Sequence, residues 1–559
     1  MSTLTSYIRN DKYKSLFYLL WFVLGVTQAA YTGLLDDEAY YWVYSRQLSW
    51  GYFDHPPMVA LLIKLGYSVF HNELGVRIGM VILNLLTLML VDQMIRPKNN
   101  RVFYLIMGGM GAMQIGGMLA VPDVPLIFFA TLYFYIYKQF LEKQDWQNTI
   151  LLGLSMALMF YSKYHGILLV FFTVLSNVSL LKVTKYYIAC VITTLLFLPH
   201  LYWQYAHHFP SIQYHLVERN AEQYDFNYTA EYIVSQILVY GPVVGWLLLY
   251  YAFTSPVMRT FERTLKFCLT GVLVFFLIST FKGRVEANWT SMIFTPLVIL
   301  AHQSIIRNRR SLKPLIYTLP VTLLLVFVFR VYMVWDFIPD IHVRPELHHN
   351  KEWAQAIKAK AGDRPVVFFN SYQAPSKYMF YAGGESYSLN SVTNRRSQYN
   401  YWHMEEPLYG RSVLLAGGYR KLFGAAPDSL EDSHGKLYLE NYDRYSSYSL
   451  IQFAWAENEI EAAPGAEVHF RLGVESGYDR QPPMFDDKPA YVGYAITGKD
   501  KYLDTVRTNL LLKDALGKDS IDLQVKMPVA PGKYRLKYSI FVPGLPPTHN
   551  SQTVKVTIK

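Results

Sequence analysis

Long apolar segments, repeated through the first 339 residues, constrain the fold of this 559-residue chain more than any other feature. A helix needs roughly 20 apolar residues to cross a bilayer. The pattern predicts a polytopic α-helical membrane domain with about 11 spans. These candidate spans cover residues 15–34, 75–95, 102–119, 123–141, 147–161, 165–181, 186–204, 231–254, 264–281, 289–306 and 314–336.

Charge is scarce, at 17% of residues, and its distribution predicts which side of the membrane each loop occupies. Residues 1–339 hold 25 Lys+Arg against 17 Asp+Glu, and residues 340–559 hold 27 against 25. The net charge of +10 therefore belongs mainly to the apolar part, which indicates membrane topology and argues against a nucleic-acid partner. With the N-terminus inside, the inside loops hold 17 basic residues and the outside loops 7, as the positive-inside rule requires.

An odd number of spans then places the C-terminal part on the outer, periplasmic face of the inner membrane. An error in one weak span, 102–119 or 147–161, would reverse that side. We predict three domains: residues 1–339 in the membrane, a soluble α/β domain over 340–463 and a β-sandwich-like domain over 464–559.

The pattern of the two soluble segments supports this division. An amphipathic stretch, Lys351–Ala361, precedes an apolar strand, Pro365–Asn370, and a second helix is expected at Ala374–Tyr381. After residue 464 short alternating runs are separated by Pro, Gly and Asp, which is typical of an antiparallel sandwich. These runs are Glu467–Val474, Ala490–Ile496, Ile521–Val525, Lys533–Phe541 and Gln552–Ile558.

Acidic residues collect in the predicted outer loops, where an unpaired charge at the membrane boundary is costly. The first loop carries Asp36-Asp37-Glu38, and a carboxylate here could take a proton from an acceptor hydroxyl. Asp54-His55 follows and is stiffened by Pro56-Pro57, so the pair could bind a divalent cation or a phosphate oxygen. The competing interpretation is an aromatic interfacial belt with solvated acids.

The other outer loops add charge of both signs. Asp123 begins a predicted span, where helix capping alone would explain it. Lys163 is either a snorkelling side chain or a phosphate ligand. The loop at 282–289 adds Arg284, Glu286 and Asn288. Together these groups suit a site for a phosphate and a polyol, since carboxylates and amides bind sugar hydroxyls, aromatics stack on sugar rings and cations neutralise a leaving phosphate.

These motifs carry a resemblance to a known family. Residues 37–42 (DEAYYW) with 51–57 (GYFDHPP) resemble the bacterial family 39 glycosyltransferases of the GT-C type, which are related to protein O-mannosyltransferases and to the aminoarabinose transferases of lipid A. The resemblance continues in order through 122–125, 162–164, 199–203, 209–211, 286–289, 394–399 and 401–402. It covers roughly residues 15–405, and the first-loop motif is its most specific part.

The resemblance implies a membrane enzyme that transfers a sugar from a polyprenyl-phosphate-linked donor, mostly with inversion. Asp37 matches the family's essential first-loop aspartate, Glu38 accompanies it, and Asp123 matches a second important acid, so these three are the predicted catalytic residues. His55, Lys163 and Arg284 are the predicted ligands of the donor phosphate. The predicted substrate-binding residues are Tyr40, Tyr52, Asp54, Glu286, Asn288, Arg395 and Arg396.

One position departs from the family. The lipid A enzymes have an acid followed by a lysine where this chain has Asp54-His55, which puts a permanent cation there in doubt. Lys163, or a divalent metal ion held partly by Asp54 and His55, would then take over that role; no other cofactor is expected. The acceptor is a glycolipid such as lipopolysaccharide, or a protein, and the sequence identifies neither it nor the sugar.

Two other functions fit the apolar composition. A transporter or flippase of polyprenyl-linked lipid would place its ionisable residues near the bilayer midplane, whereas here the acids gather at the outer boundary. A scaffold subunit with a carbohydrate-binding outer domain would not need the acid cluster of the first loop. The charge distribution favours the enzyme over both.

Overall fold

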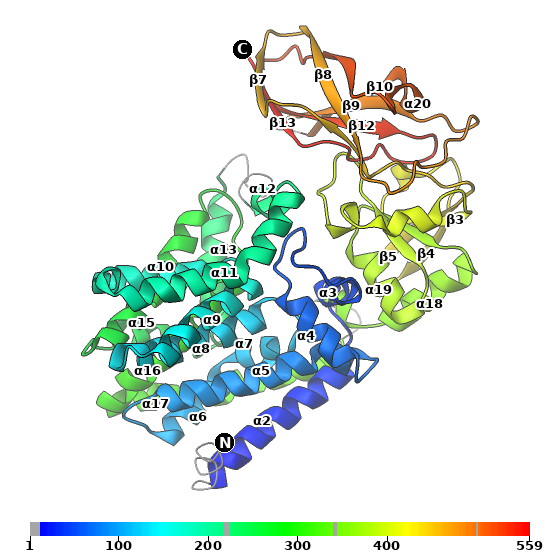
Figure 1. Cartoon of the computed structure of the whole chain (residues 1–559). Helices are drawn as coiled ribbons and strands as arrows, with labels where there is room; N and C mark the ends of the chain where they lie inside the picture. Colours follow the sequence, from blue (N-terminus) through cyan, green and yellow to red (C-terminus); the bar gives the residue numbers. More distant parts are fainter. Residues whose placement is uncertain (1–11, 216–223, 339–343, 499–500) are drawn as a thin grey trace. The chain divides into compact units, whose positions relative to one another are not determined.

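The computed structural model describes residues 12–215, 224–338, 344–498 and 501–559. The chain forms two compact units, Met1–His348 and His349–Lys559. In Figure 1 the helical first unit runs from blue to green, and the strands all lie in the second unit, from yellow-green to red, as far as the described ranges extend.

Most helices of the first unit lie in the predicted apolar segments, whereas those at 36–46, 58–67 and 210–213 lie in predicted loops. The helices are α2 (Lys12–Tyr31), α3 (Asp36–Arg46), α4 (Met58–Tyr67), α5 (Glu73–Met94), α6 (Asn100–Gly109), α7 (Gly111–Ile115), η1 (Gly116–Met118), α8 (Asp123–Glu142), α9 (Trp146–Ser162), α10 (Gly166–Ser176), η2 (Val178–Lys182), α11 (Thr184–Ala206), α12 (Pro210–Gln213), α13 (Phe226–Val239), α14 (Gly245–Thr254), α15 (Thr260–Ser279), η4 (Ala287–Ile293), α16 (Phe294–Arg307), η5 (Arg309–Ser311), α17 (Leu312–Val334) and η6 (Pro345–Leu347).

Five helices among the described residues are long and apolar enough to cross a membrane: Glu73–Met94, Asp123–Glu142, Thr184–Ala206, Ala287–Arg307 and Arg309–Val334. A bent pair formed by α2 and α3, with an angle of 87° between them, would add a sixth. Other predicted spans are interrupted, since 102–119 is divided into α6, α7 and η1, and 231–254 into α13 and α14. The number of 11 spans therefore stays a prediction.

A close approach between α5 and η1 accompanies one of these interruptions. A Cβ at Gly117 would lie 2.1 Å from Nδ2 of Asn84 on α5, so only glycine fits there. The same Asn84 amide donates to the carbonyl of Met113, 2.9 Å away. A carbonyl freed from helical bonding is satisfied in this way, which allows the chain to break inside an apolar segment.

One end of the first unit gathers charges from loops that the sequence places inside. The buried Asp92 accepts from Nζ of Lys14 at 2.6 Å, Nζ of Lys98 at 2.5 Å and the hydroxyl of Tyr18 at 2.9 Å. These residues come from α2, α5 and the loop after α5. The contact joins segments that the charge pattern assigns to one side of the membrane.

The second unit begins with an α/β part, as predicted. Its helices are α18 (Asn350–Ala361) and α19 (Gln373–Ala382), with short helices η7 (Gln398–Asn400), η8 (His403–Leu408) and η9 (Arg420–Leu422). The sheet order is β2-β1-β3-β5-β4, in which β1 pairs in parallel with β2 and β3, and β5 pairs antiparallel with β3 and β4. The strands are β1 (Val366–Phe369), β2 (Ser386–Leu389), β3 (Val413–Gly417), β4 (Asp428–Asp432) and β5 (Gly435–Tyr442).

Two further sheets follow, ordered β10-β9-β12-β13-β7 and β11-β8-β6. They face each other through contacts such as that of Phe470 with Tyr538, whose ring centroids are 5.8 Å apart. Strands β6 and β7 precede residue 464 and already belong to these sheets. The elements are β6 (Ile451–Ala454), β7 (Glu459–Ala462), β8 (Glu467–Ser476), β9 (Tyr491–Gly498), β10 (Lys501–Leu511), α20 (Leu512–Ala515), β11 (Ser520–Lys526), β12 (Gly532–Phe541) and β13 (Val554–Ile558).

Candidate functional site

The three acids of the first outer loop form the first turn of α3, where the helix dipole favours negative charge. Successive side chains on a helix point about 100° apart, so the three carboxylates have different surroundings. Asp37 is exposed, whereas Glu38 is fully buried. Of these two carboxylates, only that of Asp37 is accessible to solvent.

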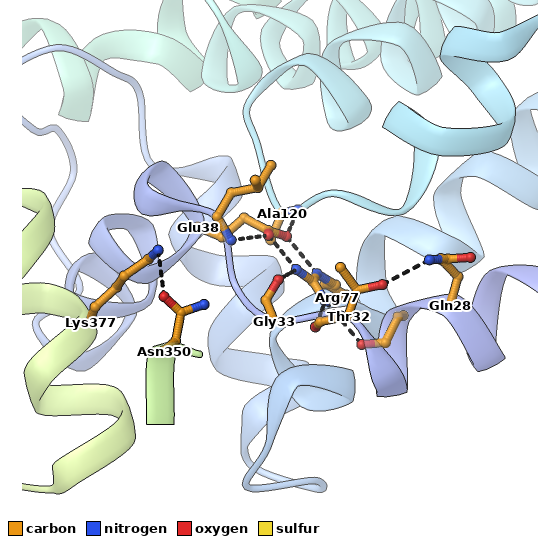
Figure 2. A network of polar contacts seen from close by, with 10 residues as sticks. Gln28, Thr32, Gly33, Glu38, Arg77, Ala120, Asn350 and Lys377 are labelled. Carbon is orange, nitrogen blue, oxygen red and sulfur yellow. Dashed lines mark hydrogen bonds and ion pairs between the residues drawn. The ribbon is translucent and has the colours of Figure 1, made fainter. Parts of the chain in front are cut away.

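Glu38 is held by Arg77 of α5, as Figure 2 shows. Nε and Nη2 of Arg77 donate to the two carboxylate oxygens of Glu38 at 2.7 and 2.5 Å. The same guanidinium donates to the carbonyls of Ala29, Thr32 and Gly33 at the end of α2. One fully buried ion pair therefore fixes the turn that carries Asp37.

Glu38 also connects this turn to the start of α8. Its Oε1 accepts from the backbone N–H of Ala120 at 2.7 Å (Figure 2). Its Oε2 accepts from the N–H of Leu35 at 2.9 Å. Ala120 lies three residues before Asp123. The carboxylate is thus saturated by donors, and it links the segments that carry the two predicted catalytic aspartates.

Asp123 is the centre of a second polar cluster, which contains three of the predicted site residues. Its Oδ1 accepts from Nζ of Lys163 at 2.8 Å, and its Oδ2 accepts from Nδ2 of Asn288 at 2.8 Å. Ser291 Oγ donates to Oδ1 at 3.2 Å. Asp123 and Lys163 are buried, whereas Asn288 is exposed, so the cluster reaches the surface on the side of η4.

Sequence reasoning missed Ser291, although it lies in the same short helix as Asn288. A spacing of three residues in a 3₁₀ helix places both side chains on one face, and that helical periodicity is the signal that would have found it. The side chains of Asp123, Lys163 and Asn288 come from three separate segments of the chain. Their convergence could not be deduced from spacing alone.

Asp54 and His55 lie in the loop between α3 and α4. Oδ1 of Asp54 accepts from the hydroxyl of the buried Tyr44 at 2.6 Å, and its carbonyl accepts from Nε2 of His215 at 3.0 Å. Nδ1 of His55 is buried and has no hydrogen-bond partner among the described residues. Tyr41 packs against the His55 ring with a centroid distance of 5.5 Å. The imidazole is therefore positioned by packing and retains bonding capacity.

These two residues give an incomplete metal site. His55 offers one unpaired ring nitrogen, and Asp54 shares its carboxylate with Tyr44. Within the described residues, three potential metal ligands come together in the second unit instead, at His403, Glu406 and Asp479. A metal ion at Asp54 and His55 therefore stays a prediction.

Burial lowers the pKa of His55 to about 4; Lys163 and His215 also lower it, while Asp54 and Asp123 raise it. Between about pH 6.5 and about pH 4 the His55 imidazole is protonated in the unfolded chain but neutral in the folded protein. We expect the protein to lose stability as the pH falls through this window, and His55→Asn to lose less. Thermal unfolding of both proteins across the window measures this difference. Equal slopes would contradict it.

The remaining predicted residues of the first unit lie outside these clusters. Arg284 is exposed, and its Nε is 3.3 Å from Oε2 of Glu231. Glu286 is half-buried at the N-cap of η4. Tyr40 and Tyr52 are fully buried in the aromatic core beside Tyr44, so the structure does not present their rings for stacking on a sugar.

Arg395 and Arg396 belong to the second unit. Arg395 is exposed, with its guanidinium 4.8 Å from the centroid of the Tyr372 ring. Arg396 is buried and donates to Oε1 of Gln452 at 2.9 Å and to the carbonyl of Ser551 at 2.6 Å. Arg396 thus joins the α/β part to the strand-rich part, and Arg395 is the more accessible of the two.

The architecture matches solved structures of membrane glycosyltransferases. The crystal structure of ArnT from Cupriavidus metallidurans bound to undecaprenyl phosphate superposes with a TM-score of 0.58 at 12% identity, covering 77% of this chain and 98% of that chain. The apo structure of the same protein gives a TM-score of 0.57 with the same coverage. At this identity the likeness shows the fold, which is that of the GT-C class.

Sequence comparisons agree with the fold. The model of the dolichyl-phosphate-mannose-protein mannosyltransferase family matches residues 54–203. The lipid A galacturonosyltransferase RgtD of Rhizobium johnstonii is 22% identical over 306 residues, which is 51% of this chain and 63% of that protein, less than two thirds of its length. The resemblance to the GT-C glycosyltransferases around protein mannosyltransferases and lipid A enzymes is thereby confirmed.

Proposed function

We propose that this protein is a membrane glycosyltransferase that moves a sugar from a polyprenyl-phosphate-linked donor to a hydroxyl or phosphate of an acceptor. Lipid A, another glycolipid or a protein would be the acceptor, on the periplasmic face of the inner membrane. Support comes from the shared fold, from the lipid A enzyme among the relatives, and from the ArnT structure that holds undecaprenyl phosphate.

The observation that carries the proposal is the meeting of Asp123, Lys163 and Asn288. Three separate segments place a cation, a carboxylate and an amide within hydrogen-bond distance. Isolated charges that cap helices or snorkel to the interface need no such convergence. Buried ionisable clusters in a membrane domain are expected where a polar substrate binds.

In the proposed reaction the acceptor oxygen attacks the anomeric carbon, and the bond from that carbon to the phosphate oxygen breaks. The acceptor proton passes to Asp37, and polyprenyl phosphate leaves, so the anomeric configuration inverts. The phosphate gains one negative charge as it leaves. Lys163 stabilises this charge, and it does so most effectively in a site from which water is excluded.

Glu38 and Asp123 have different roles in this scheme. Glu38 is saturated by donors and positions the turn of Asp37, so we assign it a positioning role in place of a chemical one. Asp123 holds Lys163 through a buried ion pair. When phosphate binds, the ammonium group can bond to both anions because it has three donors.

Lys163→Ala is expected to lower kcat/KM for the donor about 10²-fold, since it removes the buried cation of the site. Lys64→Ala is the matched control, because Lys64 is an exposed lysine of the neighbouring α4. The measurement is release of polyprenyl phosphate by purified protein given a polyprenyl-phosphate sugar and lipid A. Lipid movement across vesicles without such release would support the flippase and reject the transferase.

A further inference from the structure

A hydrogen-bond network around Tyr164 lies beside the proposed phosphate site and has no role in the scheme above. The hydroxyl of Tyr164 is 3.0 Å from Nε2 of His200, 3.0 Å from Oγ of Ser211 and 2.9 Å from Nε2 of Gln204. Gln204 also donates to Ser211 at 2.7 Å. His200, Gln204 and Ser211 are all buried. Tyr164 directly follows Lys163 in the chain, and its phenol therefore ties that segment to α11 and α12.

The far side of the network holds the loop that leads to His55. Nδ1 of His200 is 2.7 Å from the carbonyl of Trp50, and Oγ of Ser211 donates to the carbonyl of Tyr52 at 3.1 Å. The N–H of Tyr52 donates in turn to the carbonyl of His55 at 3.1 Å. The carbonyls of Trp50 and Tyr52 are therefore hydrogen-bonded to His200 and Ser211, which also contact the Tyr164 hydroxyl.

Packing confirms that the loop has little freedom. A Cβ at Gly51 would lie 2.4 Å from Cε3 of Trp203 and 3.0 Å from Nδ1 of His200. Only glycine lets the loop backbone approach α11 this closely. The network and the close approach together fix the loop against the helix.

The proton positions follow from the partners. The Trp50 carbonyl can only accept, so Nδ1 of His200 carries a hydrogen. In the neutral imidazole Nε2 is then an acceptor, so the single hydrogen of the Tyr164 hydroxyl is shared between Nε2 and Oγ of Ser211, whose own hydrogen goes to the Tyr52 carbonyl. Removing that hydroxyl leaves a buried ring nitrogen unsatisfied and releases the connection between the two loops.

From this geometry we propose that Tyr164 and His200 are positioning residues, which hold Lys163 and His55 in the mutual arrangement that receives the donor phosphate. Tyr164 is adjacent to Lys163 in the chain, and the loop held by His200 ends at His55. The proposal rests on the proposed function. It predicts that loss of the network acts through Lys163 and not through general stability.

Tyr164→Phe is expected to lower kcat/KM for the polyprenyl-phosphate sugar about tenfold, measured on the folded protein because the lost buried hydrogen bond also lowers the thermal unfolding temperature. Tyr161→Phe is the matched control: it removes a hydroxyl three residues earlier, whose bond goes to the carbonyl of Leu196, outside the network. Its kcat/KM is expected to stay at the wild-type value. Equal losses in both variants would overturn the proposal.

A double-mutant cycle separates positioning from structural damage. If Tyr164 acts through Lys163, Tyr164→Phe adds no further loss of kcat/KM in a Lys163→Ala background. Additive losses would overturn the positioning role while leaving the proposed function standing. His200→Asn retains a donor for the Trp50 carbonyl and is expected to keep more activity than His200→Ala. Absence of any sugar transfer by the wild-type protein would instead reject the proposed function.

Discussion

Asp37→Asn is expected to reduce sugar transfer by about 10²–10⁴-fold while membrane insertion and folding are retained. The amide is nearly the same size as the carboxylate, but it cannot act as a base toward the hydroxyl of the sugar acceptor. Asp37 is exposed at the start of α3, and the substitution keeps the size of the side chain. The measurement is the single-turnover rate with saturating polyprenyl-phosphate sugar and lipid A.

The neighbouring Asp36 supplies the control for this experiment. Asp36→Asn makes the same chemical change one residue earlier in the same helical turn, and we expect it to retain transfer. Full activity in Asp37→Asn would remove this residue from the reaction. Equal losses in both variants would show that the negative charge of the turn matters and not a single base.

Arg77→Met is expected to destabilise the first unit by about 3–5 kcal/mol, since it leaves the buried Glu38 carboxylate without its ion-pair partner. Three backbone carbonyls would lose donors at the same time. Thermal unfolding in detergent measures the change. Arg101→Met is the control because Arg101 is an exposed arginine of α6.

A second variant makes the interpretation secure. Arg77→Met combined with Glu38→Leu removes both charges, and we expect it to recover part of the stability while transfer stays impaired. A double variant no more stable than Arg77→Met would show that the charge of Glu38 is not the source of the loss. Normal transfer in the double variant would show that Glu38 does not position Asp37.

The sequence predicted that the outer loops bring charged and polar groups to one face, because charge sorts by side in membrane proteins. Asp123, Lys163 and Asn288 are far apart in the chain, and the predicted alternation of spans puts all three in outer loops. The family resemblance pointed to the same positions. Ser291 was outside the motif, and its contact depends on the short helix that follows the loop.

The roles of Glu38, Tyr40 and Tyr52 were beyond sequence reasoning. Asp37 and Glu38 are adjacent and chemically alike, so only the phase of α3 and a partner 39 residues away decide which acid is buried. An aromatic side chain in an outer loop can stack on a sugar or fill a core, and composition does not separate the two. Here Tyr40 and Tyr52 fill a core.

Six strands of the second unit, β1, β8, β9, β11, β12 and β13, were predicted, because alternation and turn residues are local signals, whereas β2 to β7 and β10 were not. Strands β8 and β12 start and end within a few residues of the predicted runs. Strands β6 and β7 have only four residues each. Their pairing with β8 and β13 could therefore not be predicted from local patterns.

The helices long enough to span differ greatly in how much of their surface other helices cover. Ala287–Arg307 is 89% buried over its apolar window, whereas Thr184–Ala206 and Arg309–Val334 are each 28% buried. A carbene-generating probe dissolved in the hydrocarbon phase should therefore mark the latter two heavily and spare the first. Size changes in Ala287–Arg307 should be poorly tolerated, while the exposed positions of Thr184–Ala206 and Arg309–Val334 should accept other apolar side chains, so these positions suit spectroscopic tags.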